Sequence, residues 1–203
     1  NHRESLILAL ILLVVLAAAI FLDAKLPSYH IAIKVIKKAC VYSLVAVSMN
    51  LLNGFTGLFS LGQAGFMLLG AYAYAILSIP VAKRAGVYQY FDGGIVKFSL
   101  PEVFSGIFGE AAGPIVGMLI ALLIGGLIAG LVAYLIGLPV LRLRSDYLAI
   151  ATLGFAEILR ALIQWSALGP LTNASNLLQN YPELGGATAY LLLIAVFIGT
   201  ILL

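Results

Sequence analysis

Long apolar runs separated by short polar connectors dominate this chain. Most runs approach or exceed about 20 residues, the length of α-helix that crosses a hydrocarbon core of about 30 Å. The candidate spans are residues 5–22, 39–59, 61–79, 113–138, 146–165 and 188–203. Because only helices and closed barrels satisfy the backbone in lipid, the pattern predicts an all-α fold. We expect one polytopic transmembrane helical bundle over residues 1–203, with about six spans.

The composition also indicates a lipid environment. Hydrophobic residues make up 63% of the chain and charged residues 9%, whereas soluble domains carry about 25% charged residues. No cluster of Lys and Arg alternates with aromatic residues, the pattern typical of a nucleic-acid surface. We therefore expect the bilayer to be a partner and nucleic acid not to be one.

Both ends of the sequence are apolar. Residues 5–22 follow His2 and Arg3 and could form a signal peptide, but the run is longer than the usual apolar region of about 7–15 residues. The sequence starts without Met and stops inside the run 188–203. It is therefore expected to be an incomplete copy of a longer protein.

Basic residues near the span ends predict the orientation, because Lys and Arg collect in cytoplasmic connectors. The connector with Arg142 and Arg144 is expected on the cytoplasmic side, which puts residues 166–186 outside and the N-terminus inside. The lysine-rich connector at residues 25–38 then falls outside. Either these lysines lie at an interface or one predicted span is re-entrant.

Small residues indicate where membrane helices can pack closely. The span 113–138 contains two GxxxG pairs, Gly113 with Gly117 and Gly126 with Gly130, and the two glycines of each pair lie on one helix face. The alternative is that glycine is simply frequent in transmembrane helices. Both interpretations stay open.

The sequence contains no motif for catalysis or metal binding. It lacks the phosphate-loop, HExxH, CxxC and GxSxG patterns. Cys40 is the only cysteine, and His2 and His30 have no partner at ligand spacing. We expect no catalytic residue, no metal and no cofactor, and we expect any ATP hydrolysis on a partner subunit.

Polar residues share one face of the predicted span 146–165. With a helical period of about 3.6 residues, Asp146, Glu157, Arg160 and Gln164 fall on one stripe. Glu157 lies near the middle of the span, where an ionised side chain normally faces a bundle interior or water. It is either half of an intrahelical pair with Arg160 or a residue of a transport pathway.

Other polar residues have two interpretations each. Arg142, Arg144 and Asp146 are expected at the cytoplasmic face, either as solvated charges at a helix end or as contacts for a cytoplasmic partner. In the second span, Asn50 and Asn53 either form interhelical hydrogen bonds or line a polar pathway.

Two segments resemble a known family. NLLNGFTGLFSLGQAGF at residues 50–66 with GAY at 70–72, and LPVLRLRSDYLAIATLGFAEILR at 138–160, are similar to the signature of branched-chain amino acid ABC transporter permeases. Their order and separation also match, and the similarity is greatest to the M-type subunit. Gln63 stands where many members of that family have His, and the family's ATPase-coupling segment would follow residue 203.

The resemblance implies a membrane-spanning permease subunit of an ATP-binding cassette importer for branched-chain amino acids, in the inner membrane of a prokaryotic cell. Its expected partners are a second permease subunit, two cytoplasmic ATPase subunits and an extracytoplasmic substrate-binding protein. With the polar positions above, it gives these candidates for the substrate pathway: Asn50, Asn53, Gln63, Glu157 and Arg160.

Other functions stay open. Importers of urea and short-chain amides have closely similar permeases, so the sequence pattern does not separate these cargoes. A self-sufficient channel or secondary transporter would also carry an intramembrane charge such as Glu157. Inverted repeats would favour that class, and the sequence shows no convincing internal duplication.

Overall fold

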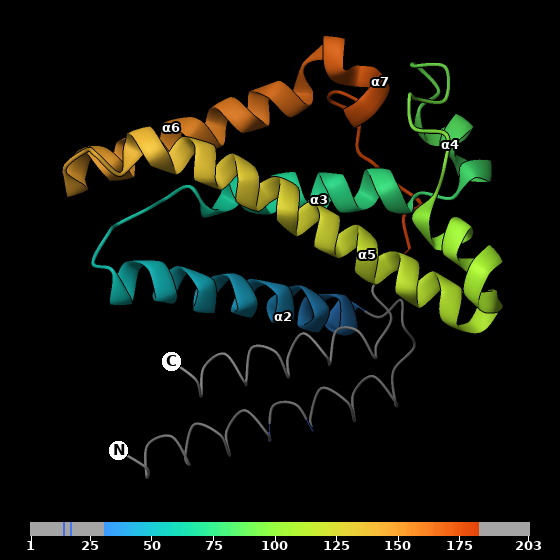
Figure 1. The fold of residues 1–203 in the computed structure, drawn as a ribbon, viewed down its shortest axis with the longest axis horizontal. Coiled ribbons are helices and arrows are strands. Elements are labelled where there is room, and N and C mark those ends of the chain that lie inside the picture. The colour runs from blue at the N-terminus through green and yellow to red at the C-terminus, as the bar shows by residue number, and fades with distance from the viewer. Residues whose placement is uncertain (1–13, 15–16, 18–30, 183–203) are drawn as a thin grey trace. The chain divides into compact units, whose positions relative to one another are not determined.

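The described part of the protein is all-α, as predicted. The computed structural model describes residue 14, residue 17 and residues 31–182, so the candidate span 188–203 and nearly all of 5–22 lie outside the described residues. No strand occurs among those that are described. They form two compact units, which divide between Leu58 and Phe59 (Figure 1).

The first unit contains the helix α2 (Ile31–Asn50), which continues directly into the π-helix η1 (Leu51–Phe55). Most of the predicted span 39–59 lies in these two elements. Helix α2 also includes Lys34 and Lys38, whose side chains are exposed. These two basic positions therefore belong to a helix and not to a loop.

The second unit contains the other elements: α3 (Gln63–Ser78), α4 (Val81–Val87), α5 (Leu100–Val140), α6 (Ser145–Gln164), the 3-10 turn η2 (Ser166–Leu168) and α7 (Gly169–Thr172). Helix α3 is the centre of this unit, because it packs against α5, α6 and α7. Figure 1 shows the long α5 crossing α3 at an angle.

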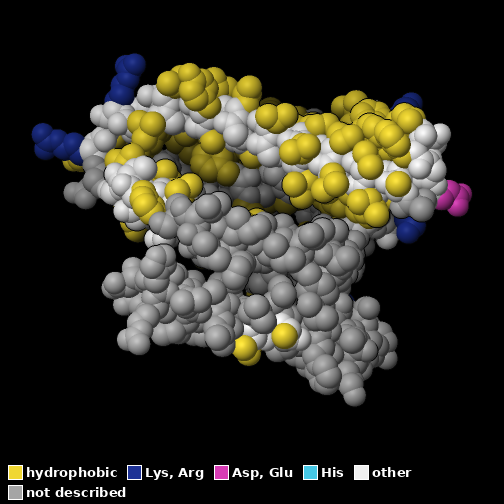
Figure 2. Space-filling view, turned by 60° about the horizontal axis from the view of Figure 1, so that its bottom comes forward, with side chains coloured by type: hydrophobic (Ala, Val, Ile, Leu, Met, Phe, Trp, Pro, Cys, Tyr) yellow, Lys and Arg dark blue, Asp and Glu magenta, His cyan; other side chains and the backbone are white. Residues whose placement is uncertain are grey.

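Two helices of the second unit are long and apolar enough to cross a membrane. They run over Ala112–Val140 and Tyr147–Gln164, and only 17% of each apolar window is buried. The core helix of a soluble protein would be mostly buried. Figure 2 shows hydrophobic side chains spread along the described part of one face, with Lys and Arg at both of its ends and Asp or Glu at one. This distribution fits a membrane protein, and the number of spans stays a prediction.

Helix α5 reverses direction at Gly109. The φ of 80° and ψ of 168° at this residue lie in a region that essentially only glycine adopts. Residues 100–108 consequently fold back along the part of α5 that follows Gly109. The contact is close, since a Cβ at Gly117 would lie 2.6 Å from the Cα of Pro101.

Two connectors pack together beyond the end of α3. Residues 81–98 and 166–182, called the connector cluster below, are joined by the Tyr88 hydroxyl, which donates to the Leu171 carbonyl at 3.0 Å. The small hydrophobic core of the cluster and the adjoining end of α3 consists of Ile79, Val87 and Tyr88, with Leu178 packed against them. Both connectors therefore lie at the same end of the unit. Two connectors on one side of a membrane would be arranged in this way.

Candidate functional site

The two segments that carry the family resemblance meet in the second unit. The Leu61 N–H donates to Thr152 Oγ1 at 3.0 Å, and the Thr152 hydroxyl donates to the Ala149 carbonyl, also at 3.0 Å. Thr152 is buried, so one hydroxyl satisfies backbone groups of both segments. The residues of this contact, called the signature junction, are Leu61, Gly62, Gly65, Thr152 and Ala156.

The junction requires small residues because the backbones of α3 and α6 touch there. A Cβ at Gly65 would lie 2.8 Å from the Cα of Ala156 and 3.1 Å from its Cβ. Added to Gly62, a Cβ would lie 3.4 Å from the Thr152 carbonyl oxygen. Close approach through small residues is the usual way in which membrane helices associate.

A second close contact joins α3 to α5. A Cβ at Gly125 would lie 3.0 Å from the carbonyl oxygen of Gly70, which belongs to the family signature. Gly125 is not part of a GxxxG pair, because that spacing selects its neighbour Gly126. Two consecutive glycines in the sequence indicate that a close helix contact is possible at this point. They do not indicate which of the two glycines faces the other helix.

The predicted packing glycines fall into two groups. At Gly113 an added Cβ would overlap the backbone of Ser105, and at Gly117 it would lie 2.6 Å from the Cα of Pro101, also in the folded-back stretch 100–108. At Gly126 and Gly130 an added Cβ would meet no atom of the described residues within 4 Å. A packing role for this second pair, against another chain, stays a prediction.

The charged pathway candidates lie on the outside of α6. Arg160 Nη1 is 3.8 Å from Glu157 Oε1, and the two side chains are 61% and 65% exposed. The intrahelical pair considered as one interpretation is thus present in the structure. Gln63, at the start of α3, is partly exposed.

The remaining candidates are positioned as follows. Asn50 ends α2, with its Oδ1 2.8 Å from the point that a Cβ on Gly54 would occupy, and Asn53 lies within the π-helix. Arg142 and Arg144 are exposed in the turn between α5 and α6, and Asp146 lies in the first turn of α6. Among the described residues, no three His, Cys, Asp or Glu side chains gather as a metal site would require.

Arg84, which no sequence pattern singled out, is the most buried charged side chain among those described in the second unit. It is 3% exposed, and its guanidinium donates to the carbonyls of Ile76, Val96 and Phe98 at 2.6–2.7 Å. Burial lowers the pKa of Arg84, and nearby Tyr88 and Glu102 oppose that shift. Arg84 therefore ties the connector cluster to the end of α3. Its only signal in the sequence was a basic residue shortly after a span.

Comparison with known proteins identifies the family. Residues 31–203 match the family described as "Branched-chain amino acid transport system / permease component". The chain belongs to this family, which confirms the resemblance seen in its sequence.

Two curated relatives agree with this assignment. The "High-affinity branched-chain amino acid transport system permease protein LivM" of Escherichia coli (strain K12) and the protein of the same name from Salmonella typhimurium are each 35% identical over 123 residues. The match covers 61% of this chain and 21% of each relative, so the chain spans only a minor part of their length. No solved structure matches it.

Proposed function

We propose that this chain is part of the membrane-spanning permease subunit of an ATP-binding cassette importer for branched-chain amino acids, crossing a prokaryotic inner membrane several times. Family membership and the names of the two relatives support the cargo. The importer class further implies a second permease subunit, two ATPase subunits and a substrate-binding protein outside the membrane. The chain itself supplies part of the path and no ATP hydrolysis.

The observation that carries a role in transport is the exposed pair Glu157–Arg160. It lies near the middle of an apolar helix, where a charged group against hydrocarbon is costly. No described residue covers it, since both side chains are more than half exposed. The face of α6 that bears the pair is therefore proposed to meet water in the pathway or the second permease subunit, and not lipid.

The signature junction has a different role in this proposal. Its contacts are made by backbone, glycine, alanine and one hydroxyl, so it presents little that could recognise an amino acid. It fixes the distance between α3 and α6. Because few large side chains interlock there, the angle between the two helices can change. We infer that the junction holds the wall of the pathway and that the polar face of α6 lies toward the cargo.

The importer assignment is tested by reconstitution. The full-length permease, its partner permease, the ATPases and the binding protein are placed in vesicles, and uptake of labelled leucine is followed with and without ATP. We expect uptake only with ATP and with every subunit present. Leucine uptake by the permease alone would indicate a self-sufficient transporter, and uptake of urea or acetamide in place of leucine would show that the cargo is wrong.

The role of the pair is tested with Glu157→Ala, Arg160→Ala and the double variant, scoring membrane abundance and leucine uptake separately. An exposed pair one turn apart contributes only about 0.2–0.5 kcal/mol, so we expect near-normal abundance with uptake lost in all three. Lys97→Ala removes an exposed connector charge and serves as control. Lower abundance in the single variants than in the double variant would show that the pair only stabilises the fold.

The orientation is tested by labelling single cysteines in a Cys40→Ala background. Ser175 and Arg144 are both exposed and lie beyond opposite ends of α6. Ser175→Cys should react with an impermeant thiol reagent from outside, and Arg144→Cys only after permeabilisation. The reverse pattern would invert the proposed topology.

A further inference from the structure

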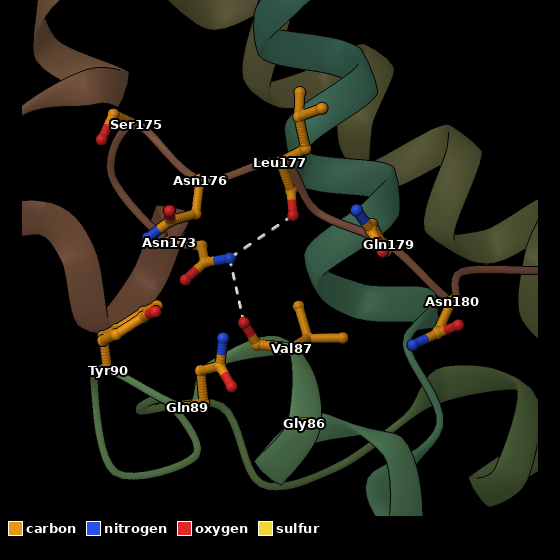
Figure 3. Close-up of a pocket in the computed structure, with 10 residues that line it drawn as sticks. All are labelled: Gly86, Val87, Gln89, Tyr90, Asn173, Ser175, Asn176, Leu177, Gln179 and Asn180. Carbon is orange, nitrogen blue, oxygen red and sulfur yellow. Dashed lines mark hydrogen bonds between the residues drawn. The ribbon is translucent and has the colours of Figure 1, made fainter.

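The connector cluster contains a polar pocket of about 400 Å³ between the end of α4 and the loop after α7 (Figure 3). That volume is within the range of small-molecule sites, about 300–1,000 Å³. The polar side chains that line it include Gln89, Tyr90, Asn173, Ser175, Asn176 and Gln179. Val87 and Leu177 add apolar surface, and none of the described residues that line the pocket carries a charge.

Asn173 gives this pocket an unsatisfied acceptor. The residue is only 1% exposed, and its Nδ2 donates to the carbonyls of Val87 at 3.0 Å and Leu177 at 3.4 Å. Because both neighbours are acceptors, the amide nitrogen must face them. Oδ1 is left without a hydrogen bond, and Figure 3 shows it turned away from these carbonyls, on the side of Tyr90.

The lining restricts the chemistry of a ligand. Carboxamides donate to a carboxylate and accept from an ammonium group, while Asn173 Oδ1 calls for an N–H or O–H donor. A ligand with a net charge would lack a counter-charge among these residues, and an unpaired charge in a protein site is costly. A zwitterion of zero net charge with an apolar side chain fits both the polar lining and the surface of Val87 and Leu177.

We propose that this pocket binds a net-neutral α-amino acid at the outer end of the permease, before the amino acid enters the membrane. The ammonium group faces Asn173 and the carboxylate faces the carboxamides of Gln89, Asn176 and Gln179. Placing the Arg142 and Arg144 connector in the cytoplasm puts residues 166–182 outside, and residues 81–98 pack against them. The choice of an amino acid rests on the proposed function.

Protection from alkylation tests the site in the assembled transporter, without ATP or binding protein. Ser175→Cys, in a Cys40→Ala background, places a thiol in the pocket lining. Ser166→Cys is the matched control, because Ser166 is also an exposed serine of the same connector but does not line the pocket. The probe is L-leucine, compared with L-lysine, L-glutamate and acetamide.

At a leucine concentration about ten times its Kd, about one site in ten is free, so alkylation of position 175 should slow about tenfold. Position 166 should be unaffected, and lysine and glutamate should not protect. Asn176→Asp should weaken protection by leucine, because the new carboxylate would face the carboxylate of the ligand. No protection by leucine, equal protection at 166, or protection by acetamide alone would overturn the proposal.

Uptake separates this result from the proposed function. A complex that transports leucine but shows no protection at position 175 refutes the pocket alone. A complex that transports urea in place of leucine refutes the cargo, whatever happens at position 175.

Discussion

The two GxxxG pairs of α5 have the same spacing, lie on the same helix and have opposite surroundings. Gly113 and Gly117 face the backbone of the folded-back stretch 100–108, whereas Gly126 and Gly130 have no close neighbour among the described residues. The helix between them makes its close contact through Gly125, which the motif does not include. A small-residue motif therefore shows that close approach is sterically allowed, and the path of the chain decides where it occurs.

The difference has a structural cause at Gly109. Its positive φ turns residues 100–108 back onto the later part of α5. Residues 100–108 therefore become the neighbours of Gly113 and Gly117. Beyond that stretch α5 packs against α3, and Gly125 lies next to Gly70. The same substitution at successive glycines of this one helix should therefore have graded effects.

The largest effect is expected for Gly113→Ala. The new Cβ would overlap the Ser105 backbone, and because both partners are main chain, no side chain can turn away. We expect a loss of about 3 kcal/mol, at the upper end of the cost of overpacking, or failure to assemble. Thermal unfolding of the purified full-length permease measures this loss. Wild-type stability would show that the reversal at Gly109 does not form.

A smaller loss is expected for Gly125→Ala. Its Cβ would lie 3.0 Å from the Gly70 carbonyl oxygen, a contact that a small shift of α3 can relieve. Overpacking costs about 1–3 kcal/mol, and alanine returns up to about 1 kcal/mol of helix propensity. The net loss in the same unfolding assay should be about 1 kcal/mol. A loss greater than that of Gly113→Ala would reverse the order of the two contacts.

Thr152→Val compares a hydrogen bond with a steric contact. Valine keeps the shape of threonine but leaves the Leu61 N–H without its acceptor, which costs about 1–3 kcal/mol if the group stays buried. Since this N–H lies at the partly exposed start of α3, the loss should be near 1 kcal/mol. Thr152→Ser keeps the hydroxyl and should restore most of it. Equal losses in both variants would mean that the methyl group, and not the hydrogen bond, stabilises the junction.

The smallest effect is expected for Gly126→Ala, the neighbour of Gly125. Its Cβ meets no atom within 4 Å in the part of the chain that the structure describes, so stability should be unchanged or rise by up to about 1 kcal/mol through helix propensity. Gly126→Leu then asks whether another subunit covers this face. Loss of the partner permease on co-purification, with the stability of the single chain unchanged, would place the second GxxxG pair in an interface. Normal co-purification would indicate that this face of α5 contacts lipid.

The sequence alone determined the class of protein and most of its helices. Apolar runs of this length must be helical in lipid, because nothing there can bond a free backbone group, and α5 and α6 follow from that rule. The segments at 50–66 and 138–160 identified the family, and the period of α6 placed Glu157 and Arg160 close enough to pair.

Only the tertiary structure decided which small and polar residues meet. Gly65 faces Ala156, and Gly125 rather than Gly126 faces Gly70, because helix crossings depend on the reversal at Gly109 and on connector lengths that no local pattern encodes. The same holds for Asn173, whose donors reach Val87 from far along the sequence. Local spacing specifies the face of one helix, whereas the partner of that face depends on contacts between distant segments.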